Sequence, residues 1–303
     1  MSVIADARAD NWVDRRAPGW AKPYLKLARF DRPVGTWLLL WPCWWSIWMA
    51  RPVLDLETLR LFVLFGIGAV VMRGAGCTVN DIADRNFDGR VERTRQRPIP
   101  SGQVSARQAL LWMGALCLIG LAILLQLDPL AIALGVGSLA LVGIYAFMKR
   151  VTYWPQIWLG LTFNWGAVMG WAAASGELGW APVFLYVGGI FWTLGYDTIY
   201  AHQDKEDDVL IGVKSAALKL GRHTRPALAV FYTLTVFFWG LAAREAGFSH
   251  WFLLPYALVV LHFGWQVARV SLDDHGNCLR TFKSNILLGA VMMVSLLVGG
   301  LAA

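Results

Sequence analysis

Residues 58–80 read TLRLFVLFGIGAVVMRGAGCTVN, an apolar run that contains only two charged residues, Arg60 and Arg73. As an α-helix, a run of about 20 apolar residues spans the roughly 30 Å of hydrocarbon in a lipid bilayer. The sequence therefore predicts an all-α, polytopic membrane protein with nine transmembrane helices. The eight further runs of this kind cover residues 34–50, 108–127, 129–148, 155–174, 180–201, 226–246, 251–268 and 285–302.

The composition agrees with a membrane protein. Of the 303 residues, 57% are apolar and 16% are charged, whereas an average soluble domain has about 45–50% apolar and about 25% charged residues. These values exclude a disordered chain, a collagen-like chain and an ordinary soluble enzyme. The four cysteines form no C-x-x-C pair, which argues against a disulfide framework and against a thiolate metal site.

Lys and Arg are distributed unevenly between the loops. The N-terminal segment 1–33 and the loops after the second, fourth, sixth and eighth runs hold 23 of the 27 Lys and Arg residues. Because basic loops favour the cytoplasmic side, we expect a cytoplasmic N-terminus and a multi-pass protein in a cell inner membrane. Segment 1–33 has no apolar signal-peptide core. The net charge of +7 then reflects orientation in the bilayer, and we expect no nucleic-acid partner.

A repeated acidic pattern suggests how the chain is organised. Asp81 and Asp88 map onto Asp197 and Asp204 with one offset of 116 residues, and each pair follows the second run of a four-run unit. We therefore expect a cytoplasmic segment, 1–33, and a single transmembrane catalytic domain, 34–303. That domain would comprise two four-helix units and a ninth helix.

Two acidic segments carry the polar chemistry. The first, residues 80–88, reads NDIADRNFD, and the second, residues 197–208, reads DTIYAHQDKEDD. In a continued α-helix the first three aspartates would lie within about 60° of arc and the second three within about 40°. These aspartates are Asp81, Asp84 and Asp88 in the first segment and Asp197, Asp204 and Asp208 in the second.

Grouped carboxylates at the end of a membrane helix need a neutralising cation. Hard oxygen ligands without neighbouring Cys or paired His suit Mg²⁺, which also takes phosphate oxygens. Two such clusters facing one cavity would hold a diphosphate through metal ions. The alternative is that these acids pair with basic residues of the same loops. Near the first segment those residues are Arg90, Arg93, Arg95 and Arg97.

With its flanking blocks, this pattern resembles the UbiA family of intramembrane prenyltransferases, and most closely the family's 4-hydroxybenzoate polyprenyltransferase branch. The acidic segments match the family's N-D-x-x-D-x-x-x-D motif and its D-x-x-x-A-x-x-D-x-x-D-D-type motif. Further matching blocks are DRPVGT at 31–36, MRGAGC at 72–77, MKR at 148–150 and GVKS at 212–215. The blocks run in order from about residue 29 to residue 285, so the resemblance covers nearly the whole chain.

The resemblance implies helices around a central cavity and a Mg²⁺-dependent enzyme. The reaction would transfer a polyprenyl group from its diphosphate to the carbon ortho to the hydroxyl of 4-hydroxybenzoate, a step of ubiquinone biosynthesis. The six aspartates would be catalytic metal ligands, with Asn80 beside the first three. Arg150 would hold the acceptor's carboxylate, and Lys214 would assist the departing diphosphate. We also expect Arg73 to face the cavity, because an arginine deep in a span is functional or paired.

Other functions remain open at this point. Within the family the acceptor could be homogentisate, a naphthoate or haem. An ion-coupled transporter would also place acids in membrane helices, but near the midplane rather than at the helix ends. The D-G-x-x-A-R element of CDP-alcohol phosphotransferases is absent from this sequence.

Several other features predict packing rather than chemistry. Gly166 and Gly170 form a G-x-x-x-G pattern, which predicts close helix contact. Trp37, Trp41, Trp44 and Trp48 recur at spacings of 4, 3 and 4, which predicts an aromatic face for helix packing or interface anchoring, with a prenyl-lining wall as the alternative. His262 is expected to be a hydrogen-bonded core residue. His202, inside the second acidic segment, matches no family role.

Overall fold

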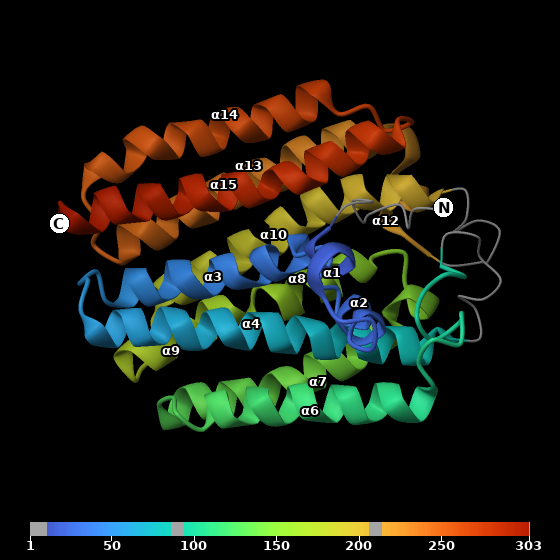
Figure 1. Ribbon diagram of the computed structural model, residues 1–303. Helices are drawn as coiled ribbons and strands as arrows, with labels where there is room; N and C mark the ends of the chain where they lie inside the picture. The colour runs from blue at the N-terminus through green and yellow to red at the C-terminus, as the bar shows by residue number, and fades with distance from the viewer. Residues whose placement is uncertain (1–10, 86–93, 206–213, 303) are drawn as a thin grey trace. The chain divides into compact units, whose positions relative to one another are not determined.

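The computed structural model describes residues 11–85, 94–205 and 214–302, without the side chains of residues 146–147, 149–150 and 204. Every regular element in these ranges is a helix, which confirms the all-α prediction (Figure 1). The chain forms two compact units. Unit 1 comprises Met1–Trp37 and Gly66–Gln126, and unit 2 comprises Leu38–Phe65 and Leu127–Ala303.

Unit 1 contains the short helices α1 (Trp12–Arg16) and α2 (Lys22–Leu27), the second half of α4 (Leu56–Ala83), and α6 (Ala106–Leu124). A capping box between Ser105 and Gln108 starts α6. The end of α2 packs closely on α4, because a Cβ at Gly74 would meet Ala28 and Leu116. This close approach fixes the turn that follows α2 relative to the end of α4.

Unit 2 contains the remaining helices around an aromatic core. Trp45, Trp192 and Trp239 are fully buried, and their ring centroids lie 4.9–5.4 Å apart. Helices α13, α14 and α15 run side by side (Figure 1). The elements are most of α3 (Val34–Ala50), α7 (Pro129–Val151), α8 (Pro155–Phe163), α9 (Trp165–Ser175), α10 (Trp180–Ala201), η1 (His202–Asp204), α12 (Ala216–Leu220), η2 (Gly221–His223), α13 (Thr224–Glu245), η3 (His250–Phe252), α14 (Leu253–Arg269) and α15 (His275–Leu301).

Five helical stretches in the described ranges are long and apolar enough to cross a membrane. They are Leu56–Ala83, Ala106–Leu124, Ala216–Glu245, His250–Arg269 and His275–Leu301. Helices also cover the other predicted runs, but the count of nine spans stays a prediction. The chain is therefore a multi-pass membrane protein by the length and hydropathy of its helices.

Two predicted runs differ from the helices that form. The run 155–174 is divided into α8 and α9 at Asn164, whose Nδ2 donates to the Gly160 carbonyl and to Thr193. A polar side chain that bonds the backbone in this way competes with the helical ladder. The last run begins at His275 instead of residue 285, because Oδ1 of Asp274 caps the helix by accepting from the Asn277 N–H.

The packing predictions are confirmed. A Cβ at Gly166 would meet the Cys43 side chain, and a Cβ at Gly170 would meet Ser46, so α9 lies directly against α3. The indole nitrogens of Trp44 and Trp48 donate to backbone carbonyls of neighbouring helices at 3.0 Å. These contacts need no bound ligand.

Candidate active site

Asp81 lies in the last turn of α4, and its side chain is only 1% exposed. Its Oδ1 atom accepts a hydrogen bond of 2.6 Å from Nη2 of Arg29 and one of 3.2 Å from Nη1 of Arg97. Its Oδ2 atom is buried and has no hydrogen-bond partner within the described ranges. The carboxylate is thus held at one of its two oxygens by two guanidinium groups.

Arg29 occupies the turn after α2 with a φ of 59°, a left-handed conformation that is uncommon for residues other than glycine. Its Nη1 donates to the Lys26 carbonyl at 3.0 Å. Burial acts to lower the pKa of the Arg29 guanidinium, but the negative charges around it, Asp81 foremost, outweigh burial and raise the pKa. Arg29 is therefore a permanent cation beside the first acidic segment.

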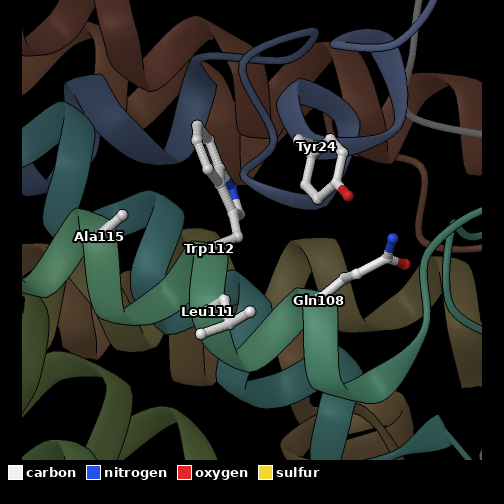
Figure 2. A pocket seen from close by; sticks show the side chains of 5 residues that line it. All are labelled: Tyr24, Gln108, Leu111, Trp112 and Ala115. Atoms are coloured by element: carbon white, nitrogen blue, oxygen red, sulfur yellow. The ribbon is translucent and has the colours of Figure 1, made fainter.

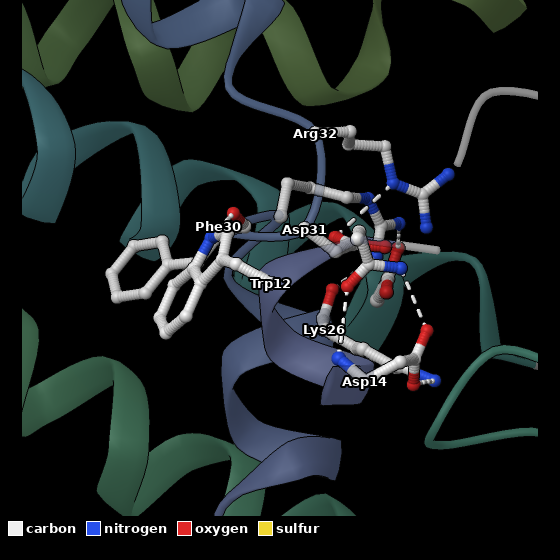
Figure 3. A network of polar contacts seen from close by, with 9 residues as sticks. Trp12, Asp14, Lys26, Phe30, Asp31 and Arg32 are labelled. Atoms are coloured by element: carbon white, nitrogen blue, oxygen red, sulfur yellow. Dashed lines mark hydrogen bonds and ion pairs between the residues drawn. The ribbon is translucent and has the colours of Figure 1, made fainter. Parts of the chain in front are cut away.

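The segment around this turn is fixed by polar contacts (Figure 3). Nε1 of Trp12 donates to the Phe30 carbonyl at 2.8 Å, and Lys26 pairs with Asp14 at 2.6 Å. Asp31 is buried next to this turn, and its Oδ1 lies 3.4 Å from Nε of Arg32. These contacts join α1, α2 and the turn into one small scaffold.

The other residues predicted for the first site lie nearby in unit 1. Asn80 and Arg73 are half-buried on α4, and the Arg73 guanidinium lies against Gly35. Asn80 lies seven positions after Arg73, so the two share a face of the helix. Asp84 follows the end of α4 at Ala83 and is half-buried. The Asp84 N–H still donates to the Asn80 carbonyl at 2.9 Å, so the helical hydrogen bonding that relates Asp84 to Asp81 reaches this residue.

Several predicted site residues lie outside the ranges that the structure describes. Asp88, Asp208, Arg90 and Arg93 lie in the ranges that the structure does not describe, as do the side chains of Asp204 and Arg150. Of the basic residues expected to pair with the first segment, Arg97 does pair, with Asp81. The pairing alternative thus holds for Arg97 and Oδ1 of Asp81, while Oδ2 of Asp81 has no hydrogen-bond partner within the described ranges.

The second acidic segment belongs to unit 2. Asp197 is half-buried in the last turns of α10, whereas Asp204 ends the 3-10 helix η1. The α-helix stops at Ala201, so the angular alignment expected between Asp197 and Asp204 does not apply.

The Lys214 side chain lies at the end of α7. Its Nζ donates to the Val151 carbonyl at 3.2 Å and lies 5.4 Å from the ring centroid of Tyr153. Because Val151 follows Arg150 in the chain, the structure brings two predicted substrate-binding positions into one neighbourhood of unit 2. The backbone after Lys214 is held as well, since the Ala216 N–H donates to Oε1 of Gln156 at 3.3 Å.

His202 has a structural role. It is 3% exposed, and its Nε2 lies 3.1 Å from Oγ1 of Thr224, which donates its own hydrogen to the Gly221 carbonyl. A threonine hydroxyl has one hydrogen, so this pattern indicates that Nε2 of His202 is the donor. Burial, aided by Lys205, lowers the pKa of His202 to about 4. A neutral histidine therefore fastens η1 to the start of α13.

A buried polar network supports α10 before Asp197. Nδ2 of Asn164 donates to Oγ1 of Thr193 at 2.8 Å, and Thr193 bonds the Tyr196 hydroxyl at 3.1 Å. On another face, Nε1 of Trp192 donates to Oδ1 of Asn285 at 2.8 Å. His262 bonds Gln266 as expected, but it is half-buried rather than part of the core.

The described residues contain no group of three or more His, Cys, Asp or Glu side chains that could hold a metal ion. Half of the six predicted aspartate side chains lie outside the described residues. The Oδ2 atom of Asp81 nevertheless fits a hard cation, because it is a buried carboxylate oxygen without a hydrogen-bond partner in the described ranges. The predicted magnesium site stays a prediction.

A pocket of about 270 Å³ opens in unit 1 away from these residues (Figure 2). It is lined by Tyr24 of α2 and by Gln108, Leu111, Trp112 and Ala115 of α6, and its walls are mostly apolar. None of the predicted site residues lines it.

Sequence reasoning missed Arg29 and Asp31 as parts of the first site. Asp31 begins the DRPVGT block at 31–36, which carried only a resemblance, and Arg29 lies two positions before that block and 52 positions before Asp81. The available signal was the placement of charged residues immediately before an apolar run, where burial demands a partner.

Comparison with known proteins places these features in a family context. Residues 39–296 match the UbiA prenyltransferase family. The chain is 45% identical over 290 residues to the mitochondrial 4-hydroxybenzoate polyprenyltransferase of Arabidopsis thaliana, covering 95% of this chain and 71% of the relative. It is 46% identical over 297 residues to the enzyme of the same name from Caenorhabditis elegans, covering 96% of this chain and 82% of the relative.

Solved structures show the same fold. An apo UbiA homologue from Aeropyrum pernix K1 matches with a TM-score of 0.72 and 24% identity, covering 86% of this chain and 96% of that one. A UbiA homologue from Archaeoglobus fulgidus bound to GPP and Mg²⁺ matches with a TM-score of 0.69 and 20% identity, covering 92% and 98%. The predicted UbiA-type fold is therefore confirmed.

The predicted location in a cell inner membrane, with a cytoplasmic N-terminus, is wrong. The relatives from A. thaliana and C. elegans are both named as mitochondrial enzymes, and this finding overturns that expectation. The distribution of Lys and Arg reports on which loops share a side of a bilayer. It carries no information about which organelle contains that bilayer.

Proposed function

This chain belongs to the UbiA prenyltransferase family, and we propose from that premise that it is a 4-hydroxybenzoate polyprenyltransferase. It transfers a polyprenyl group from polyprenyl diphosphate to the ring carbon ortho to the hydroxyl of 4-hydroxybenzoate, giving 3-polyprenyl-4-hydroxybenzoate in ubiquinone biosynthesis. The observation that carries this proposal is 45–46% identity, over at least 95% of the chain, to relatives of that name. The same names favour 4-hydroxybenzoate over homogentisate, a naphthoate or haem as acceptor.

The cofactor of the proposed reaction is Mg²⁺. Its proposed ligands are Asp81, Asp84 and Asp88 of the first acidic segment and Asp197, Asp204 and Asp208 of the second. The buried, unbonded Oδ2 of Asp81 and the Mg²⁺ bound to the A. fulgidus homologue support this assignment. Bound Mg²⁺ supplies charge neutralisation that makes the diphosphate a good leaving group.

The chain's own residues would bind and orient the two substrates. Lys214 carries a positive charge to the end of α7 and is suited to the diphosphate. Arg150 would hold the acceptor's carboxylate through paired N–H donors. Arg73 and Asn80, on one face of α4, would extend the polar lining beside the first aspartates.

The bond changes follow from the leaving-group chemistry. The allylic C–O bond to the diphosphate breaks as the ring carbon of the phenol forms a new bond to the terminal carbon. The ring proton then passes to a carboxylate or to the released diphosphate, which restores aromaticity. Apolar walls would exclude water that otherwise quenches the cationic carbon. The prenyl tail is a hydrocarbon, and a membrane location lets it extend into lipid.

The test is an incubation of the purified protein in lipid nanodiscs with labelled 4-hydroxybenzoate and a polyprenyl diphosphate, with and without Mg²⁺. We expect a labelled prenylated acid only when both substrates and Mg²⁺ are present. Parallel reactions with homogentisate and with a naphthoate compare the acceptors directly. A product from one of these and none from 4-hydroxybenzoate would reassign the acceptor, and no product from any would contradict the proposal and leave the transporter alternative.

A further inference from the structure

The backbone at Arg29 is held in an uncommon conformation by its surroundings. The φ of 59° places it in the left-handed region, and the Phe30 N–H donates to the Leu25 carbonyl at 2.9 Å to close the turn. The preceding residue, Ala28, is 1% exposed and packs against Gly74 of α4. A non-glycine residue persists in this conformation only where neighbouring contacts over-determine it, and such positions concentrate at functional sites.

The consequence of this turn is the direction of one side chain. The Arg29 side chain is 12% exposed; its Nη2 donates to Oδ1 of Asp81 at 2.6 Å, and its Nη1 donates to the Lys26 carbonyl. Arg97 reaches the same oxygen at 3.2 Å. Both cations therefore bind one oxygen, and the buried Oδ2 has no hydrogen-bond partner among the described residues.

We propose that Arg29 is a positioning residue that holds Oδ1 of Asp81 so that Oδ2 is presented to a divalent cation. The proposal rests on the function proposed above, because that function requires Asp81 as a metal ligand. Groups that bond the far side of a ligand fix its orientation, and losing them typically lowers metal affinity about 10- to 100-fold. A simple ion pair that only joins the α2 turn to α4 would stabilise unit 1 without affecting metal affinity.

The experiment measures binding of Mn²⁺ alone, as a paramagnetic substitute for Mg²⁺, by electron paramagnetic resonance of the full-length protein in nanodiscs. Leaving out the diphosphate separates a role at the metal from a direct contact with substrate. The test variant is Arg29→Gln, and Arg29→Lys keeps the charge. The matched control is Arg60→Gln, which breaks an ion pair of 2.7 Å with Glu57 on the exposed start of α4.

We expect Arg29→Gln to bind Mn²⁺ about 10- to 100-fold more weakly than the wild type, Arg29→Lys to lose less, and Arg60→Gln to be unchanged. The activity of Arg29→Gln, relative to that of the wild type, should be higher at saturating Mg²⁺ than at low Mg²⁺. Wild-type Mn²⁺ affinity in Arg29→Gln would overturn the proposal. If Arg29→Gln does not fold, as judged by size-exclusion chromatography, Arg29→Lys decides between the same two outcomes.

The Asp81→Asn variant distinguishes a failure of this proposal from a failure of the metal assignment in the proposed function. If Asp81→Asn loses Mn²⁺ while Arg29→Gln retains it, only the role of Arg29 is wrong. If Asp81→Asn also binds Mn²⁺ normally, Asp81 is not a ligand, and the metal assignment in the proposed function fails together with this inference.

Discussion

Nδ2 of Asn164 donates a hydrogen bond of 2.8 Å to Oγ1 of Thr193, which joins the break between α8 and α9 to α10 one helical turn before Asp197. Both side chains are buried, at 1% and 0% exposed. Where no water can replace a lost partner, a buried polar group must be satisfied within the protein. The bond therefore ties the irregular backbone at Asn164 to the helix that carries the second acidic segment.

Thr193→Val removes this bond and preserves the shape of the side chain. We expect a loss of stability of about 1–2 kcal/mol, because the Tyr196 hydroxyl and Asn164 each lose a buried partner. The measurement is thermal unfolding in detergent. Thr233→Val is the control, since that exposed hydroxyl bonds only its own helix at Ala229. Equal melting temperatures for the two variants would show that the Asn164 bond contributes nothing measurable.

The contact between α9 and α3 predicts a large effect for a small substitution. Gly170→Ala places a Cβ against the Ser46 side chain and the Cys43 carbonyl, and the backbone atom cannot move away easily. We expect destabilisation of about 1–3 kcal/mol, the usual cost of overpacking. Gly137→Ala, at an exposed helical position with open space around it, should be neutral or slightly stabilising. Equal melting temperatures for Gly170→Ala and Gly137→Ala would contradict this prediction.

His202 predicts a dependence of stability on pH. Burial lowers its pKa in the folded protein to about 4, against about 6.5 when unfolded. The unfolded chain therefore binds more protons between these values, so the contribution of His202 is complete above pH 6.5 and is lost as the pH falls toward 4. The difference corresponds to about 3 kcal/mol.

Melting temperatures measured from pH 7.5 to 4.5 test this dependence. His202→Asn should be less stable than the wild type at pH 7.5, and its melting temperature should fall less with acid. His250→Asn, at an exposed position, should follow the wild-type curve. A wild-type slope retained in His202→Asn would assign the acid sensitivity to another group.

How far the sequence predicts this protein depends on the range of each interaction. The helices and the Gly166–Gly170 contact follow from hydrophobic runs and small residues, because those signals are local. The break at Asn164 was missed, since it depends on a partner on α10, 29 residues away. In the same way, the sequence places Asp81 at a helix end, but the pairing with Arg29 depends on the turn after α2.

We expect substitutions of the aspartates in the acidic segments to reduce catalysis without reducing membrane insertion. Asp81→Asn and Asp204→Asn should each lower prenyl transfer by at least about 100-fold, because each removes a charged group from the proposed metal site. Glu57→Gln, in the exposed ion pair with Arg60 at the start of α4, is the matched control and should stay active. Transfer would be assayed in membranes with equal amounts of inserted protein, with and without chelation of divalent cations. Full turnover in both variants, or in the chelated wild type, would contradict the metal roles.

The positions of Lys214 and Arg150 near the end of α7 predict which of the two substrates each residue binds. Arg150→Gln should raise the KM for 4-hydroxybenzoate at least about tenfold, because a charge-assisted pair with the carboxylate is lost, while the KM for polyprenyl diphosphate stays close to the wild type. Lys214→Gln, which loses the cation held at the Val151 carbonyl, should show the reverse pattern.

The decisive substrate is methyl 4-hydroxybenzoate, which keeps the phenol but has no carboxylate. Wild type and Arg150→Gln should use it equally poorly, because the group that Arg150 binds is absent. A further drop for Arg150→Gln with the ester would mean that Arg150 acts elsewhere, on the diphosphate or on the fold of α7.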